Sequence, residues 1–153
     1  MGLISLLTKD PAAFVVVAVL LLYSIIAHEV AHGFVAKLFG DTTAEDEGRL
    51  TANPLPHIDP IGLLMLFVAG FGWAKPVPVN YGYLRRSRFG LIAVSLAGVT
   101  VNFIIALAAA FLLQFPLIRG IHPPSVALAV AVNINVILAA FNLIPLPPLD
   151  GYI

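Results

Sequence analysis

The hydrophobic residues of the chain gather into three long runs separated by polar and proline-rich stretches. The first run begins after Asp10 and Pro11, a candidate cap and first-turn proline, and continues from residue 12 to about residue 39. Two further runs extend over about residues 89–115 and 125–144. An α-helix rises about 1.5 Å per residue, so about 20 apolar residues cross the roughly 30 Å hydrocarbon core of a bilayer. The pattern therefore predicts an all-α polytopic membrane protein with three core transmembrane helices, at 12–39, 89–115 and 125–144.

The connection between the first two helices, residues 41–87, has a different pattern. Its prolines interrupt any helical hydrogen-bond ladder; they are Pro54, Pro56, Pro60, Pro76 and Pro78. Val77 and Val79 alternate with prolines, which predicts a short edge strand, where prolines are tolerated. Residues 61–71 are apolar but only about half a bilayer long, so we expect a re-entrant or interfacial segment there, with a fourth complete span as the alternative.

Composition supports a membrane location and excludes several classes of function. The chain is 60% hydrophobic and 10% charged, against about 25% charged in a soluble domain. Eight Lys and Arg offset eight Asp and Glu, which leaves no basic surface for nucleic acid. There is no cysteine, so disulfides and thiolate metal sites are excluded. Any metal must therefore be held by His, Asp or Glu. The length of 153 residues predicts a single domain, 1–153.

The first helix carries the sequence His28-Glu29-Val30-Ala31-His32, a His-Glu-x-x-His motif. The two histidines lie one helical turn apart on the same face, so both imidazoles can bind one ion. A catalytic zinc site needs three protein ligands and an open position for water, and Glu29 is placed to accept the proton of that water. Hydrogen bonding within a helix bundle is the alternative, but charged groups near the bilayer centre each cost about 2.5 kcal/mol or more without a compensating partner or ion. The motif therefore predicts a metal site.

A third ligand must come from the other acidic residues, which are Asp10, Asp41, Glu45, Asp46, Glu47, Asp59 and Asp150. Asp150 is favoured because it follows the third helix and a proline-rich bend that restricts the chain near membrane depth. A cap for a following helix is its alternative role. The acidic run 45–47 is expected in a solvated loop, Asp59 in a turn before a proline, and His57 in a loop hydrogen bond.

Several motifs together resemble the site-2 protease family, which are intramembrane zinc metalloproteases, in the compact prokaryotic form without a PDZ domain. They are the His-Glu-x-x-His motif, residues 142–151 at the end of the third helix, and residues 72–79 between the first two helices. Gly98-x-x-x-Asn102 in the second helix also resembles a family signature, in which a small residue allows close helix approach and an amide points inward. Ordinary helix packing is the alternative explanation for this last pair.

The resemblance implies the roles of particular residues. It implies one zinc ion per chain, with His28, His32 and Asp150 as ligands. It implies Glu29 as the general base and later the proton donor, and Asn142 as a polar group near the scissile carbonyl.

The resemblance also implies partners, and the distribution of positive charges predicts a location. The substrate would be a transmembrane protein in a lipid bilayer, and an unwound substrate helix would pair with the edge formed by residues 72–80. Positive charges gather in and beside the connection 41–87, which places it in the cytoplasm by the positive-inside rule. The active site is then expected near the cytoplasmic side of a prokaryotic plasma membrane. Family members continue beyond the position of Asp150, whereas this sequence ends at Ile153, so we expect a core domain truncated at its C-terminus.

Two other functions remain as alternatives. A metal transporter or sensor would use the same three residues to bind a travelling ion, but a transporter is expected to have pseudo-symmetric halves, and no second histidine-rich helix mirrors the first. A pseudoprotease would bind transmembrane helices without cutting them; the intact motif argues against it and the short C-terminus argues for it. Zinc content and a cleavage assay on a Glu29 variant distinguish the three.

Overall fold

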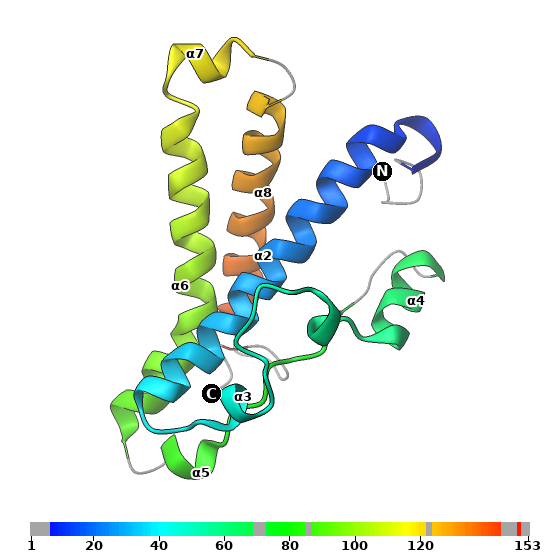
Figure 1. The fold of residues 1–153 in the computed structure, drawn as a ribbon. Coiled ribbons are helices and arrows are strands. Elements are labelled where there is room, and N and C mark those ends of the chain that lie inside the picture. Colours follow the sequence, from blue (N-terminus) through cyan, green and yellow to red (C-terminus); the bar gives the residue numbers. More distant parts are fainter. Residues whose placement is uncertain (1–6, 69–72, 85–86, 122–123, 145–149, 151–153) are drawn as a thin grey trace.

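The computed structural model describes residues 7–68, 73–84, 87–121, 124–144 and 150 of the chain, and helices dominate it (Figure 1). The long helices are α2 (Pro11–Leu38), α6 (Arg88–Leu112) and α8 (Pro124–Asn142). The short ones are α3 (Thr43–Asp46), η1 (Leu55–His57), α4 (Pro60–Val68), α5 (Tyr81–Leu84) and α7 (Pro116–Arg119).

The three long helices confirm the predicted fold class. They contain 28, 25 and 19 residues, and each is long and apolar enough to cross a membrane. α2 begins where the Asp10 carboxylate accepts the Ala13 N–H at 3.0 Å and Pro11 occupies the first turn. α6 begins in a similar way, because the Ser87 hydroxyl accepts the Gly90 N–H at 3.0 Å. The observed limits differ from the predicted ones by no more than three residues.

Small residues line the contacts between the long helices. α6 packs against both α2 and α8, and in Figure 1 α6 and α8 run side by side while α2 crosses them obliquely. Buried alanines include Ala97 and Ala106 on α6 and Ala131 on α8, whereas a large side chain such as Phe111 is exposed. Lipid tails are as apolar as these large side chains, so close approach between small residues stabilises helix association in a membrane.

The helix α4 occupies the apolar part of the connection. It begins at Asp59, whose carboxylate accepts the N–H groups of Ile61 and Gly62 at 2.8 Å each. Its 9 residues cover about 14 Å at 1.5 Å per residue, which is about half of the hydrocarbon core. The re-entrant or interfacial placement of this segment stays a prediction. The end of that predicted segment, residues 69–71, lies outside the described residues.

The short strand expected at Val77 and Val79 is not formed. The described residues contain no strand, and one isolated antiparallel bridge joins Ile58 to Ala74. The prolines that alternate with the two valines have no N–H to donate, and the N–H of Val77 bonds to a side chain instead of a neighbouring strand. We call residues 74–80 the linker segment.

Two buried charged side chains hold the linker segment in place. Arg49 is 5% exposed and donates from Nη2 to the carbonyl oxygens of Lys75 and Pro76, at 2.8 and 3.1 Å. Asp41 is fully buried and accepts the N–H of Asn80 at 2.6 Å. Hydrogen bonds to charged groups contribute about 1.5–3 kcal/mol each, so these side chains fix the course of the segment along α2.

Arg49→Met is expected to destabilise the fold by about 1–3 kcal/mol, because the carbonyl oxygens of Lys75 and Pro76 lose the charged donor that the buried Arg49 supplies. Denaturant unfolding of the purified protein in detergent measures this change. Lys37→Met is the control, since the Lys37–Glu45 pair at 2.7 Å lies on the surface and its loss is expected to cost less than about 1 kcal/mol. Equal destabilisation by the two substitutions would contradict the role given to Arg49.

Candidate metal centre

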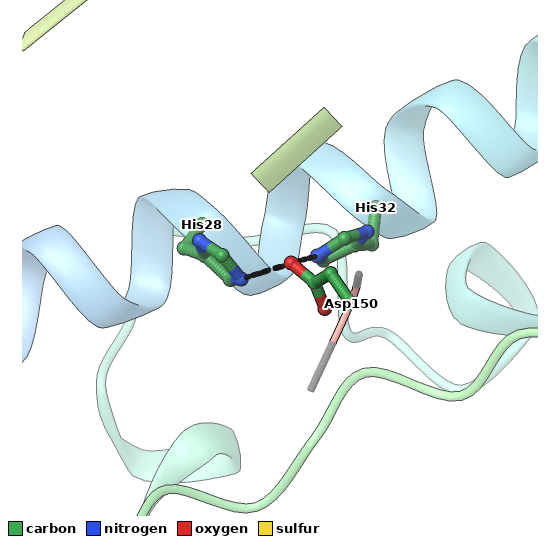
Figure 2. A group of neighbouring side chains, drawn as sticks. All are labelled: His28, His32 and Asp150. Carbon is green, nitrogen blue, oxygen red and sulfur yellow. Dashed lines mark hydrogen bonds and ion pairs between the residues drawn. The ribbon is translucent and has the colours of Figure 1, made fainter. Parts of the chain in front are cut away.

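Three side chains from opposite ends of the chain converge in the structure. They are His28 and His32 from α2 and Asp150, which follows α8 (Figure 2). The Nε2 atoms of His28 and His32 lie 2.9 and 3.0 Å from the same oxygen, Asp150 Oδ2. The two Nε2 atoms are 3.2 Å apart. We call this triangle of two nitrogens and one oxygen the donor triangle.

The donor triangle has the dimensions of a zinc site. In tetrahedral zinc sites nitrogen and oxygen ligands lie about 2.0–2.2 Å from the metal, which puts the ligands about 3.3–3.6 Å apart. The observed separations of 2.9 to 3.2 Å are a few tenths of an ångström shorter. Burial alone would raise the pKa of Asp150, but hydrogen bonds donated by the Nε2–H groups of His28 and His32 outweigh it and lower that pKa to about 2. Asp150 is therefore a carboxylate at neutral pH. A metal would replace the two Nε2 protons, and three donors would leave a fourth coordination position open.

The contact between α2 and α6 positions the two imidazoles. Nδ1 of His32 lies 2.7 Å from the Val94 carbonyl oxygen. Because a carbonyl oxygen can only accept, Nδ1 carries the proton, which leaves the Nε2 lone pair for a metal. Gly98 lies against both rings: a Cβ at this position would come closer than 3.0 Å to atoms of His28 and of His32. The absence of a side chain at Gly98 therefore lets α6 approach the donor triangle.

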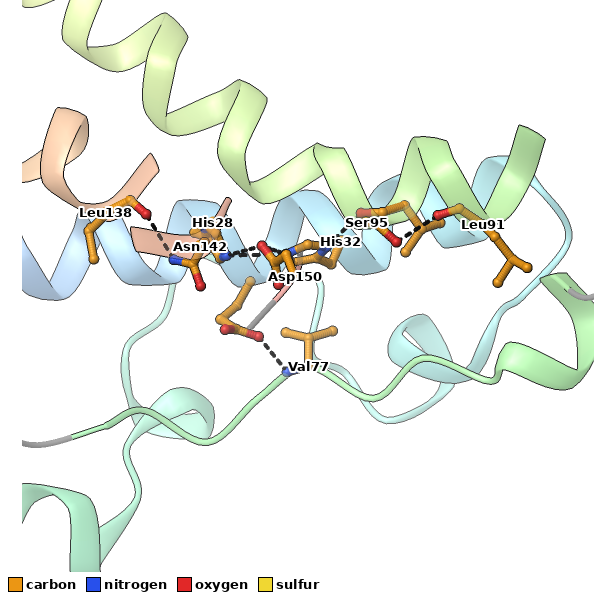
Figure 3. A network of polar contacts seen from close by, with 10 residues as sticks. His28, His32, Val77, Leu91, Ser95, Leu138, Asn142 and Asp150 are labelled. Atoms are coloured by element: carbon orange, nitrogen blue, oxygen red, sulfur yellow. Dashed lines mark hydrogen bonds and ion pairs between the residues drawn. The ribbon is translucent and has the colours of Figure 1, made fainter. Parts of the chain in front are cut away.

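Glu29 lies beside the donor triangle and contacts the linker segment. Its Oε2 accepts the N–H of Val77 at 3.0 Å (Figure 3). Gly33, one turn along α2, allows this approach, since a Cβ there would come closer than 3.0 Å to the Val77 side chain. The Val77 N–H thus anchors the carboxylate of Glu29, the residue that follows His28, against the linker segment.

Two other polar residues considered from the sequence have described hydrogen bonds to backbone carbonyl groups and not to the donor triangle. The Nδ2 of Asn142 donates to the Leu138 carbonyl oxygen at 3.0 Å, within α8 (Figure 3). His57 is fully buried, and its Nε2 lies 3.0 Å from the Thr51 carbonyl oxygen. The latter contact is the loop hydrogen bond that the sequence led us to expect.

Tyr81 is a residue near the site that the sequence did not reveal. It begins α5, directly after the linker segment. Burial, and then the negative charges of Asp150 and Glu29, raise the pKa of Tyr81, so its phenol stays protonated and can donate a hydrogen bond. No spacing in the sequence connects this tyrosine with α2, and the tertiary structure places it where the charges of both carboxylates act on its pKa.

An apolar cavity of about 110 Å³ adjoins α2. Ala18, Leu22 and Ile25 line it, and their spacing puts them on the helix stripe that continues to Glu29. The facing wall is formed by residues of the connection, which are His57, Ile58, Asp59, Gly62, Leu63, Trp73 and Ala74. The carboxylate of Glu29 and this cavity therefore lie along one side of α2.

The sequence is similar to known bacterial proteins. The protein named "Putative zinc metalloprotease YwhC", from Bacillus subtilis, is 42% identical over 139 residues, which are 86% of this chain and 64% of that protein. This similarity agrees with the resemblance to the site-2 protease family. Two proteins named "Putative zinc metalloprotease Rip2" are 37% identical in Mycobacterium tuberculosis and 34% identical in Mycolicibacterium smegmatis, over 95% of this chain and 59% of each relative. No family model and no solved structure matches the chain.

The relatives' names agree with the chemistry of the donor triangle. The relatives are named zinc metalloproteases, and the donor triangle offers two histidine nitrogens and one carboxylate oxygen, the ligand types of a zinc site. The chain spans less than two thirds of the length of these relatives, about 64% of one and 59% of the others. With its three long apolar helices, it is a multi-pass membrane protein.

Proposed function

We propose that this chain is the core of an intramembrane zinc endopeptidase, which hydrolyses a peptide bond in or near a transmembrane segment of a membrane-protein substrate. One observation carries the proposal: three zinc-binding donors, with Glu29 beside them, lie on and after helices apolar enough to cross a bilayer. Binding an ion requires only the donors. A carboxylate anchored next to an open coordination position is what hydrolysis requires in addition.

His28, His32 and Asp150 would hold zinc, which supplies a Lewis acid for the scissile carbonyl and lowers the pKa of bound water from 15.7 toward about 7. Glu29 accepts a proton from the attacking water as the water oxygen bonds to the carbonyl carbon. Glu29 then returns this proton to the amide nitrogen as the C–N bond breaks. One water is consumed, and one carboxylic acid and one amine are formed.

Two side chains are candidates for stabilising the negative charge that develops on the carbonyl oxygen. Asn142 is the residue that family resemblance suggests, and its amide would have to release the Leu138 carbonyl oxygen to donate. Tyr81 is the second candidate, because its phenol keeps its proton and the charges of Asp150 and Glu29 act on its pKa. Either donor would act alongside the metal.

The proposed substrate is a transmembrane helix that unwinds locally. A peptide bond inside a helix is shielded by its neighbours, whereas an extended segment offers its carbonyl to the metal. The linker segment beside Glu29 supplies a surface for such a segment. The cavity of about 110 Å³ on the Glu29 side of α2 would accept one apolar side chain of the substrate.

The cytoplasmic side is proposed for the active site. His28 and His32 belong to the second half of α2, which leads into the connection 41–87, and six of the eight Lys and Arg lie in or directly beside this connection. Positively charged connections of this length stay in the cytoplasm in prokaryotic plasma membranes. Water and released products would therefore exchange at the end of α2 that carries Lys37.

Cleavage of a single-span test protein by the purified full chain is expected to stop when a chelator removes zinc and to return when zinc is added back. Gel electrophoresis and intact mass of the fragments measure this in detergent or vesicles. Cleavage that persists without zinc would contradict the proposal. Bound zinc without cleavage of any membrane substrate would favour a pseudoprotease, and zinc flux into vesicles without cleavage would favour a transporter.

A further inference from the structure

A buried polar layer lies one helical turn from the donor triangle. It consists of Ser24 on α2, Asn102 on α6 and Asn135 on α8, whose exposures are 6%, 0% and 0%. The Nδ2 of Asn135 donates to the Ser24 hydroxyl at 2.9 Å. An amide buried among apolar helices is costly unless its donors and acceptors are bonded. The layer therefore needs partners for both asparagines.

Four polar atoms in and beside this layer have no hydrogen-bond partner within the described part of the chain. They are His28 Nδ1, Asn102 Nδ2, Asn102 Oδ1 and Asn135 Oδ1. When the Nε2 of His28 faces a metal, its Nδ1 carries the proton, so the four atoms are two donors and two acceptors. One continuous chain satisfies all of them: His28 donates to Asn102, Asn102 donates to Asn135, and Asn135 donates to Ser24.

The register of α2 and α6 brings Asn102 toward His28. The two helices are antiparallel, because His32 pairs with Val94 while His28 lies against Gly98. Side chains on a helix lean toward its N-terminus. His28 therefore leans toward the level of Asn102, and Asn102 leans back over Gly98, the residue that the His28 ring faces. The two unpartnered groups approach each other from facing helices.

We propose that Asn102 is a positioning residue for the zinc site: its Oδ1 accepts the Nδ1 proton of His28, directly or through one ordered water, while its Nδ2 donates to Asn135. The inference rests on the zinc site proposed above. Asn102 Oδ1 would then accept the Nδ1 proton of His28, just as the Val94 carbonyl oxygen accepts the Nδ1 proton of His32. Such partners fix the tautomer and orientation of a metal-binding histidine and raise its affinity for the metal.

Asn102→Leu keeps nearly the same volume but has no acceptor, and it is expected to weaken zinc binding by about 10–100-fold. Asn102→Ala removes the acceptor without adding bulk and is expected to weaken zinc binding to the same extent. This second variant tests the inference if Asn102→Leu does not fold. Asn102→Asp keeps the acceptor and is expected to bind zinc at least as tightly as the parent. Competition with a chromophoric chelator measures the affinity of the full chain in detergent.

Ser95→Ala is the matched control. Ser95 is buried on the same helix, but its hydroxyl donates to the Leu91 carbonyl oxygen within α6, so its loss is expected to leave zinc affinity unchanged. Thermal unfolding of the metal-free proteins reports any packing effect separately. Parent-like zinc affinity in Asn102→Leu and Asn102→Ala, or equal weakening in Asn102→Asp, would overturn the inference. A parent chain that binds no zinc would instead overturn the proposed zinc site.

Discussion

Glu29→Gln is expected to retain zinc and to lower the rate of substrate cleavage by about 10²–10⁴-fold, the contribution of a general base. Glutamine has the shape of glutamate, and its amide oxygen can still accept the N–H of Val77, so the local structure is kept. An amide cannot take a proton from water, and none of the three donors of the zinc site is changed. Zinc content by elemental analysis and initial cleavage rates measure the two quantities separately.

Glu45→Gln is the control for this substitution. Glu45 is an exposed carboxylate that pairs with Lys37 at 2.7 Å, away from the donor triangle. Its replacement is expected to leave both zinc content and cleavage unchanged. Undiminished cleavage by Glu29→Gln would rule out Glu29 as the base, and a joint loss of zinc and activity would show that Glu29 supports the metal instead of the proton transfer.

Gly98→Ala is expected to weaken zinc binding by at least about fivefold and to lower cleavage with it. The added Cβ would come closer than 3.0 Å to atoms of both imidazoles, and these atoms include the Nε2 atoms that face Asp150. Either α6 must move away from α2 or the rings must rotate out of the donor triangle. Extra methyl groups in packed interiors cost about 1–3 kcal/mol, which corresponds to about 5–150-fold in a binding constant.

Gly120→Ala is the control for the glycine substitution. The nearest atom to a Cβ at Gly120 is the Pro116 carbonyl oxygen at 3.4 Å, an ordinary contact far along the chain from Gly98. Zinc affinity and cleavage are expected to stay at the parent level in this variant. Parent-like zinc affinity in Gly98→Ala would mean that α6 can shift without disturbing the imidazoles. It would contradict the claim that zinc binding needs the close approach of α6 at Gly98.

The long helices could be predicted closely because each depends on local properties. Apolar length is set by the thickness of the bilayer, and the ends carry caps such as Asp10 and Ser87 that act within one turn. The prediction of a strand at Val77 and Val79 was wrong, because a strand depends on contacts with a second, distant segment. Alternation describes one segment, but a strand needs a second segment to pair with, and here the side chains of Glu29, Arg49 and Asp41 bind the backbone of the linker segment instead.

The sequence by itself determined the membrane environment, the three spans and the pair of imidazoles one turn apart, because hydrophobic length and helical periodicity act over neighbouring residues. Only the tertiary structure brought Asp150 to His32 across 118 positions of sequence and set Gly98 against both rings. It also brought Tyr81 and Asn102 toward the site. These residues come together because of the way α2, α6 and the linker segment pack. Packing between distant segments depends on the shapes of all the side chains in the contact, which a local sequence pattern does not contain.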